Sequence, residues 1–268
     1  QAGKNNITNM PNISAFNDKF RDAIKGSTFN ASGKGYVTNS DGVYDIMKGI
    51  EGSINWSWGL TSTQSINYVS AHDNLTLYDK LNAANGGTGY TKEIDYQARL
   101  SNSIVMFSQG VPFLHAGVDF LRTKGGNENS YDASDTVNQL NWIRKSSYVD
   151  SFEYYKGIIK IRKTYESFKM VSESEIEENL TFIYPTGNGM IGYNLTKNNE
   201  DILIYHNGGE SINDITLPSG AWMLIADRDF AGLDSLGTFT ATYPIEKAET
   251  LVFVRGEYAN LIESPIHE

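Results

Sequence analysis

The chain has 268 residues, a formal net charge of −10 and no cysteine. It is long enough to bury a substantial core, and the missing cysteines exclude disulfides and thiolate metal sites. The negative charge argues against a nucleic-acid partner, and no apolar run approaches the roughly 20 residues of a membrane helix. Aromatic residues make up 12% of the sequence, which is compatible with stacking on sugar rings or with aromatic-rich strands.

The first 165 residues alternate predicted helices with short strands, as in an α/β fold. The clearest helix covers residues 93–108, where Glu93 and Asp95 begin an apolar stripe and Gly110 follows its end. Short apolar runs at 67–71 and 111–117 predict strands. Further helices are expected at 14–24 with Ser14 as the cap, 43–50, 75–81 and 152–165, and loops at 27–42, 82–89 and 122–141.

A polar cluster, His72-Asp73-Asn74, ends the first predicted strand. In a (β/α)8 barrel the catalytic groups lie at the carboxyl ends of strands. A charged histidine donates two hydrogen bonds and a carboxylate accepts two, which suits the vicinal hydroxyls of a sugar ring. A purely structural His–Asp pair is the alternative interpretation.

The predicted loop 122–141 is dense in hydrogen-bonding residues, among them Arg122, Asn127 and Tyr131. A loop of this length beside a strand end is typically functional or disordered. Its composition favours a loop that faces a sugar over a linker.

From residue 166 the pattern becomes a series of short β-rich runs separated by turns, with no helix signal. This pattern predicts an all-β antiparallel sandwich at 166–268, after an α/β domain at 1–165. His206 and His267 are expected to be exposed and without function. The predicted strands are 180–184, 190–195, 202–206, 212–217, 222–227, 239–243 and 250–255.

Four segments resemble, in order, the type I pullulanases of the α-amylase superfamily, glycoside hydrolase family 13. They are the polar helix at 16–26, the strand end at 66–74, the segment 108–117, and the loop 120–131 followed by 137–139. The resemblance implies the C-terminal part of a (β/α)8 barrel followed by the family's β-sandwich. The pair Val118-Asp119 departs from many relatives and puts local packing in doubt.

The resemblance implies retaining cleavage of α-1,6-glucosidic bonds in pullulan, amylopectin and limit dextrins. Asp73 matches the family's transition-state-stabilising carboxylate, and His72 matches its sugar-binding partner. Arg122, Asn127 and Tyr131 are the other expected substrate-binding residues. Asn74 is expected to shape the strand end, and His115 to be packed in the barrel wall or to touch substrate.

The family's nucleophile Asp and acid Glu have no counterpart in the chain. They are expected upstream of Gln1, so the chain alone is expected to be inactive and to need the N-terminal part of the enzyme as its partner. Isoamylase, glycogen debranching enzyme, neopullulanase and a non-catalytic carbohydrate-binding fragment remain alternatives. No metal site is expected in the chain, structural calcium in the full-length enzyme stays open, and the localisation is undetermined.

Overall fold

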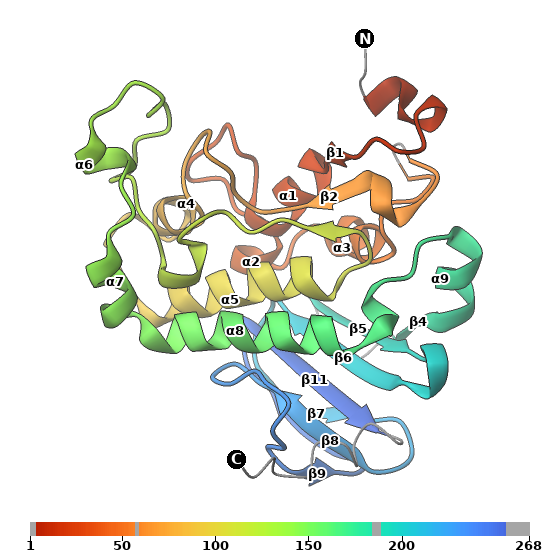
Figure 1. Cartoon of the computed structure of the whole chain (residues 1–268). Coiled ribbons are helices and arrows are strands. Elements are labelled where there is room, and N and C mark those ends of the chain that lie inside the picture. The colour runs from red at the N-terminus through yellow and green to blue at the C-terminus, as the bar shows by residue number, and fades with distance from the viewer. Residues whose placement is uncertain (1–3, 57–58, 184–188, 256–268) are drawn as a thin grey trace, which may run out of the picture.

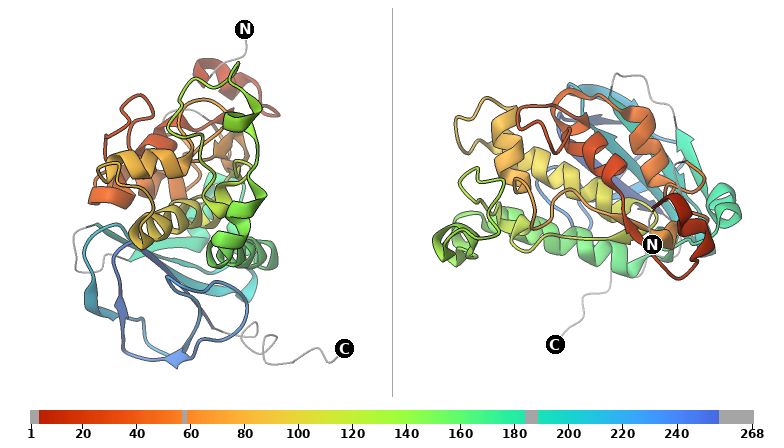
Figure 2. Two further views of the ribbon diagram at one scale, coloured as in Figure 1. Left: turned by 90° about the vertical axis from the view of Figure 1, so that its left-hand side faces the viewer. Right: turned by 90° about the horizontal axis from the view of Figure 1, so that it is seen from above.

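The computed structural model describes residues 4–56, 59–183 and 189–255 (Figure 1). Three short parallel strands and several helices form one layer, the long helices α5 and α8 lie beneath them, and antiparallel sheets form the opposite side (Figures 1 and 2). Within the described ranges no helix has both the length and the apolar character needed to cross a membrane. The prediction that His267 is exposed and without function falls outside these residues.

The longest helices, α5 (Lys92–Phe107) and α8 (Val149–Thr164), pack against each other. The prediction of α5 is confirmed: Thr91 Oγ1 accepts from the Ile94 amide at 3.2 Å, and two carboxylates lie in its first turn. The remaining α-helices are α1 (Asp18–Lys25), α2 (Tyr36–Asn39), α3 (Val43–Ile50), α4 (Leu77–Ala84), α6 (Asp135–Asn138), α7 (Trp142–Ser147) and α9 (Glu173–Asn179).

Three parallel strands, β1 (Ala15–Phe16), β2 (Ser65–Asn67) and β3 (Val111–Pro112), pair in the order β1-β2-β3. Their carboxyl ends therefore meet at one edge of the sheet. The predicted strand at 67–71 is wrong in its position, because the hydrogen-bonded ladder ends at Asn67.

The predicted start of the helix at Ser14 is also wrong. Ser14 donates to the carbonyl of Thr63 at 2.7 Å, and the two residues after it form β1. Asn17 is the actual cap, because its Oδ1 accepts from the Phe20 amide at 3.1 Å.

Antiparallel sheets form the rest of the described chain. The larger sheet has the order β4-β5-β6-β11-β8-β9, and β7 pairs with β10 in a second sheet. The strands are β4 (Leu180–Ile183), β5 (Met190–Leu195), β6 (Asp201–Asn207), β7 (Ile212–Thr216), β8 (Trp222–Ala226), β9 (Thr238–Phe239), β10 (Thr242–Ile245) and β11 (Glu249–Arg255).

Within the six-stranded sheet, β5, β6, β8 and β11 are buried on both faces, which explains why these strands read as continuous apolar runs. In β6, Ile202 and Ile204 belong to the core shared with α5 and α8, while Leu203 and Tyr205 belong to a second core with β7 and β10. This strict alternation follows from the period of two along a strand.

Three further expectations are wrong in the region from residue 166. Helix α9 was not expected, and the predicted strand 239–243 is two strands, β9 and β10, separated at Ala241 by a left-handed backbone with φ 70°. His206 is fully buried and not exposed. Its side chain lies on the same face of β6 as Ile202 and Ile204, so the helices packed on that face cover it.

Burial lowers the pKa of His206 to about 3, so the folded protein keeps this ring neutral between Tyr193 and Thr250. The unfolded chain takes up a proton below its ordinary pKa of 6.5, so folding stability falls as the pH drops from 6.5 towards 3. At pH 4.5 we expect a loss of about 2 kcal/mol from this residue. Urea unfolding at pH 7 and 4.5 should show a smaller pH-dependent loss in His206→Gln than in the wild type, and equal losses would contradict this assignment.

Candidate active site

A groove of about 470 Å³ lies at the carboxyl ends of the three parallel strands, beside α1. We call it the strand-end groove. It is lined by Phe16, Asp18, Arg21, Lys25, Thr28, Tyr68, Ser70, Ala71, His72, Asp73, Asn74 and Phe113.

One side of the strand-end groove is aromatic. The ring of Phe16 lies edge-on to the rings of Tyr68 and Phe113, with centroid distances of 4.8 and 5.2 Å. Each ring comes from the end of a different parallel strand, so the strand register sets their contact. Phe16 is 39% exposed, which leaves apolar surface available for the face of a sugar ring.

A polar network on α1 borders these rings. Tyr68 donates its hydroxyl to Asp18 at 2.5 Å, and Arg21 donates to the same hydroxyl at 2.6 Å. Burial alone would raise the pKa of Asp18, but hydrogen bonds from Lys4 and Tyr68 outweigh it and lower the pKa. Asp18 is therefore held as a carboxylate on the wall of the groove.

His72 and Asp73 lie together at the mouth of the groove. His72 Nε2 is 3.4 Å from Asp73 Oδ1, and their side chains are 88% and 76% exposed. Both side chains are thus free to meet a ligand. Asn74 follows with a left-handed backbone of φ 62°, which turns the chain directly after Asp73.

The loop that carries His72 and Asp73 is tied to the loop after residue 121. Lys124 is buried, and its Nζ donates to the His72 carbonyl and to Ser130 Oγ, both at 3.0 Å. The buried carboxylate of Asp79, in the first turn of α4, accepts from the Lys124 amide at 2.8 Å and from the Thr123 hydroxyl. These bonds connect the backbone at His72, through Lys124, to the buried carboxylate of Asp79 and so fix its position.

Three sequence-predicted site residues are not among those that line the strand-end groove. Arg122 points back toward the fold, with Nη1 3.3 Å from His115 Nε2 and Nη2 donating to the Asn138 carbonyl at 2.5 Å. Asn127 Oδ1 accepts from the Asn129 amide at 2.9 Å.

Tyr131 is 82% exposed at the surface of the loop. His115 is half-buried, and burial together with the nearby Arg122 lowers its pKa to about 4. It is therefore a neutral ring at physiological pH.

Several lining residues escaped the sequence analysis, although a signal was present for some of them. Asp18, Arg21 and Lys25 recur at i, i+3 and i+7, opposite the apolar positions Phe20 and Ile24 of the same helix. A polar stripe at helical spacing that begins directly after a strand could have assigned α1 to the site.

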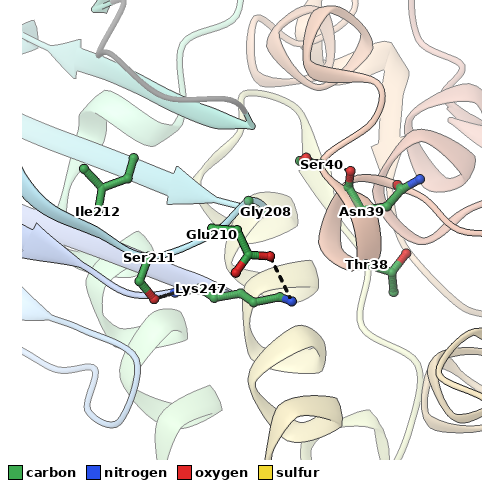
Figure 3. Close-up of a pocket in the computed structure, with 9 residues that line it drawn as sticks. Thr38, Asn39, Ser40, Gly208, Glu210, Ser211, Ile212 and Lys247 are labelled. Carbon is green, nitrogen blue, oxygen red and sulfur yellow. Dashed lines mark hydrogen bonds and ion pairs between the residues drawn. The ribbon is translucent and has the colours of Figure 1, made fainter.

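A second hollow, of about 240 Å³, lies where α2 meets the end of β6 (Figure 3). Its charged groups are paired with each other, because Lys247 Nζ is 3.5 Å from Glu210. Ser211 Oγ accepts from the Lys247 amide at 3.0 Å and donates to Glu246 at 2.8 Å. These groups are already satisfied, so the hollow provides no comparable set of free polar groups.

No group of three or more His, Asp or Glu side chains that could hold a metal ion occurs in the described part of the chain.

No family model matches the chain. The pullulanase of Bacillus subtilis strain 168 is 36% identical over 225 residues, which are 80% of this chain and 31% of the relative. The crystal structure of pullulanase type I from Bacillus subtilis str. 168, complexed with maltose, has a TM-score of 0.89 and 32% identity, covering 96% of this chain and 37% of that chain. Isoamylase 1 of Arabidopsis thaliana is 30% identical over 185 residues, 58% of this chain and 22% of the relative.

The fold and these relatives place the chain in the α-amylase family. Within it the chain belongs with the type I pullulanases, as its sequence motifs predicted. The chain spans 31% of the length of the first curated relative it matches.

Proposed function

We propose that the strand-end groove is the part of a pullulanase active site that holds the sugar at the point of cleavage. The observation that carries the proposal is the placement of Asp73 and His72, exposed at the carboxyl end of β2 beside an aromatic wall. This is where barrel enzymes place catalytic groups. In this proposal Asp73 accepts hydrogen bonds from ring hydroxyls and His72 donates to the same sugar.

Asp73 works by differential binding. A retaining glycosidase passes through an oxocarbenium-like transition state in which the ring is distorted. Contacts to the hydroxyls that strengthen in this state lower the barrier, whereas contacts of equal strength in both states do not. The covalent step needs a nucleophilic carboxylate and an acid, which we assign to residues other than those described here.

The three parallel strands and the helices up to α8 fit the last part of a (β/α)8 barrel, occupying residues 1–165. The antiparallel sheets fit a β-sandwich domain at 166–268, although one buried core runs from α5 and α8 into the six-stranded sheet. Because the chain matches about a third of its relatives' length, we assign to it a share of the site, and we propose the remaining part of the enzyme as its partner.

Arg122, Asn127 and Tyr131 remain candidates for contacts with a longer glucan. Their loop is anchored behind His72 by Lys124, so a chain leaving the groove on this side would pass over it. Tyr131, with its exposed ring, is the member of this set best placed to stack on a sugar.

The test is hydrolysis of pullulan by the full-length protein, with products separated by chromatography. Maltotriose as the product supports α-1,6 cleavage and the pullulanase assignment. Panose or isopanose would overturn it. The isoamylase relative makes isoamylase the second candidate, and it would be favoured by debranching of amylopectin without attack on pullulan.

A further inference from the structure

Two polar side chains that line the strand-end groove are buried and have no hydrogen-bonding partner among the described residues. Ser70 is 3% exposed, and its Oγ makes no hydrogen bond to any described residue. Lys25, at the end of α1, is 2% exposed, and within the described ranges its ammonium group has no hydrogen bond or ion pair. Buried polar groups in folded proteins are almost always paired, so each such exception needs a reason.

A neighbouring lysine shows that this fold can satisfy a buried ammonium group. Lys80 is 1% exposed, and its Nζ donates to the carbonyls of Asn30 at 2.7 Å, Ala31 at 3.1 Å and Gly33. Among the described residues, no comparable set of carbonyl groups accepts from Lys25.

The carboxylate of Asp22, one turn before Lys25, is already engaged. It accepts from Arg21 Nε at 2.6 Å and from the Thr28 hydroxyl at 3.0 Å. The open side of Lys25 is the groove, so its partner is expected to come from there.

The chemistry of the groove selects the class of partner. The lining carries the carboxylates of Asp18 and Asp73 as well as the cationic side chains of Arg21 and Lys25, so its charges balance and it favours a neutral ligand over an ion of either sign. The partly exposed ring of Phe16 offers an apolar face. A neutral polyhydroxyl ring, with apolar faces and hydroxyl groups at its edge, matches both features.

We propose that Lys25 Nζ and Ser70 Oγ, which we call the buried polar lining, bind ring hydroxyls of an α-glucan residue lying in the strand-end groove. The proposal rests on the proposed function and adds two ligand contacts to it. The hydroxyl groups of a sugar ring can both donate and accept hydrogen bonds, and the Ser70 hydroxyl has the same capacity.

The charge state of Lys25 is compatible with this role. Burial, followed by repulsion from Arg21, lowers the pKa of Lys25 to about 7, against an opposing effect of Asp22. His115 and Lys80 are the other titratable groups in its electrostatic surroundings. Near neutral pH the amine can therefore either donate or accept.

A ligand-binding role and a structural role predict opposite effects on stability. An unpaired buried charge destabilises the fold, so an apolar side chain of similar length should leave the stability unchanged or raise it. A residue that supports the fold would lower the stability when replaced. Affinity and stability measured together separate the two roles.

The experiment uses the full-length protein with Lys25→Met, Ser70→Ala and the control Lys34→Met, an exposed lysine on the loop after α1. Isothermal titration with maltotriose should show about tenfold weaker binding for each of the first two variants and no change for the control. Their urea midpoints should stay at or above the wild-type value. The proposal would be overturned if both variants kept the wild-type affinity for maltotriose. It would also be overturned if their affinity fell together with a lower urea unfolding midpoint.

Failure of this inference can be distinguished from failure of the proposed function. If the wild type binds maltotriose and hydrolyses pullulan while both variants bind like the wild type, only the buried polar lining is refuted. If the wild type does neither, the proposed function fails together with it. Ser70→Ala removes a single unpaired oxygen, so it keeps the test decisive even if Lys25→Met does not fold.

Discussion

Asp73→Asn is expected to lower kcat for pullulan hydrolysis by the full-length protein about 10³-fold, with a much smaller change in KM. The amide is nearly the same size as the carboxylate but carries no charge and accepts fewer hydrogen bonds. If Asp73 acts on the distorted ring, the loss appears in the chemical step and only weakly in ground-state binding. Steady-state kinetics with pullulan measure the effects on kcat and on KM separately.

The matched control for this prediction is Asp234→Asn. Asp234 is exposed on the segment between β8 and β9, and the same change there should leave kcat and KM at their wild-type values. Urea unfolding should show the Asp73 variant as stable as the wild type, because this side chain is 76% exposed. A kcat within about threefold of the wild type would remove Asp73 from the reaction.

The parts of the fold that the sequence predicted correctly are those decided by nearby residues. Helix α5 combines a Thr91 cap, acidic residues in the first turn and a long apolar stripe, and all three signals are local. Helix α9 carried a comparable signal, because Ser172 accepts from the Glu175 amide at 3.2 Å and Glu175 binds the Val171 amide at 2.8 Å. Ser172 and Glu175 have the spacing of a capping box, but the Glu175 carboxylate accepts from the amide of Val171, the residue before the cap, and this short signal stands among β-rich runs.

The start of α1 could not be predicted in this way, because distant residues decide it. Asn17 Nδ2 donates to Ser53 Oγ at 2.7 Å and to Ser65 Oγ at 2.9 Å. These bonds hold Asn17 beside β2 and let its Oδ1 cap the helix, so the more obvious Ser14 is left outside.

The residues of the candidate site also fall into two groups, those that a local sequence pattern predicts and those whose role depends on contacts across the fold. His72 and Asp73 are adjacent in the sequence and follow an apolar run, so the sequence pattern alone identified them as candidate site residues. The importance of Lys25 and Ser70 depends on their burial, which arises from contacts across the fold. His206 could be predicted only in part. Its spacing of two residues from Ile204 and four from Ile202 predicts that all three side chains share one face of the strand, but only the helices packed on that face show that it is buried.

Arg162→Met is expected to lower the free energy of unfolding by about 3–5 kcal/mol. Arg162, on α8, is 7% exposed and donates to the carbonyls of Met106, Ser108 at 2.7 Å and Gly110 at 2.7 Å. These carbonyls end α5 and begin the turn into β3, where a helix presents unpaired acceptors and partial negative charge. Burial lowers the pKa of Arg162 to about 10, so the group remains charged at neutral pH.

Methionine fills much of the same space but leaves three buried carbonyls without their donor, which is the source of the expected loss. Arg162→Lys should retain part of the stability, because an ammonium group keeps the charge but not the fork that reaches all three oxygens. Lys160→Met, at an exposed position on the same helix, is the control and should unfold within about 0.5 kcal/mol of the wild type. Urea unfolding at pH 7 measures all three variants. A loss below about 1 kcal/mol for Arg162→Met would mean that water or a shifted turn replaces the guanidinium group. It would also mean that the α5–β3 turn, at the amino end of β3, does not depend on α8.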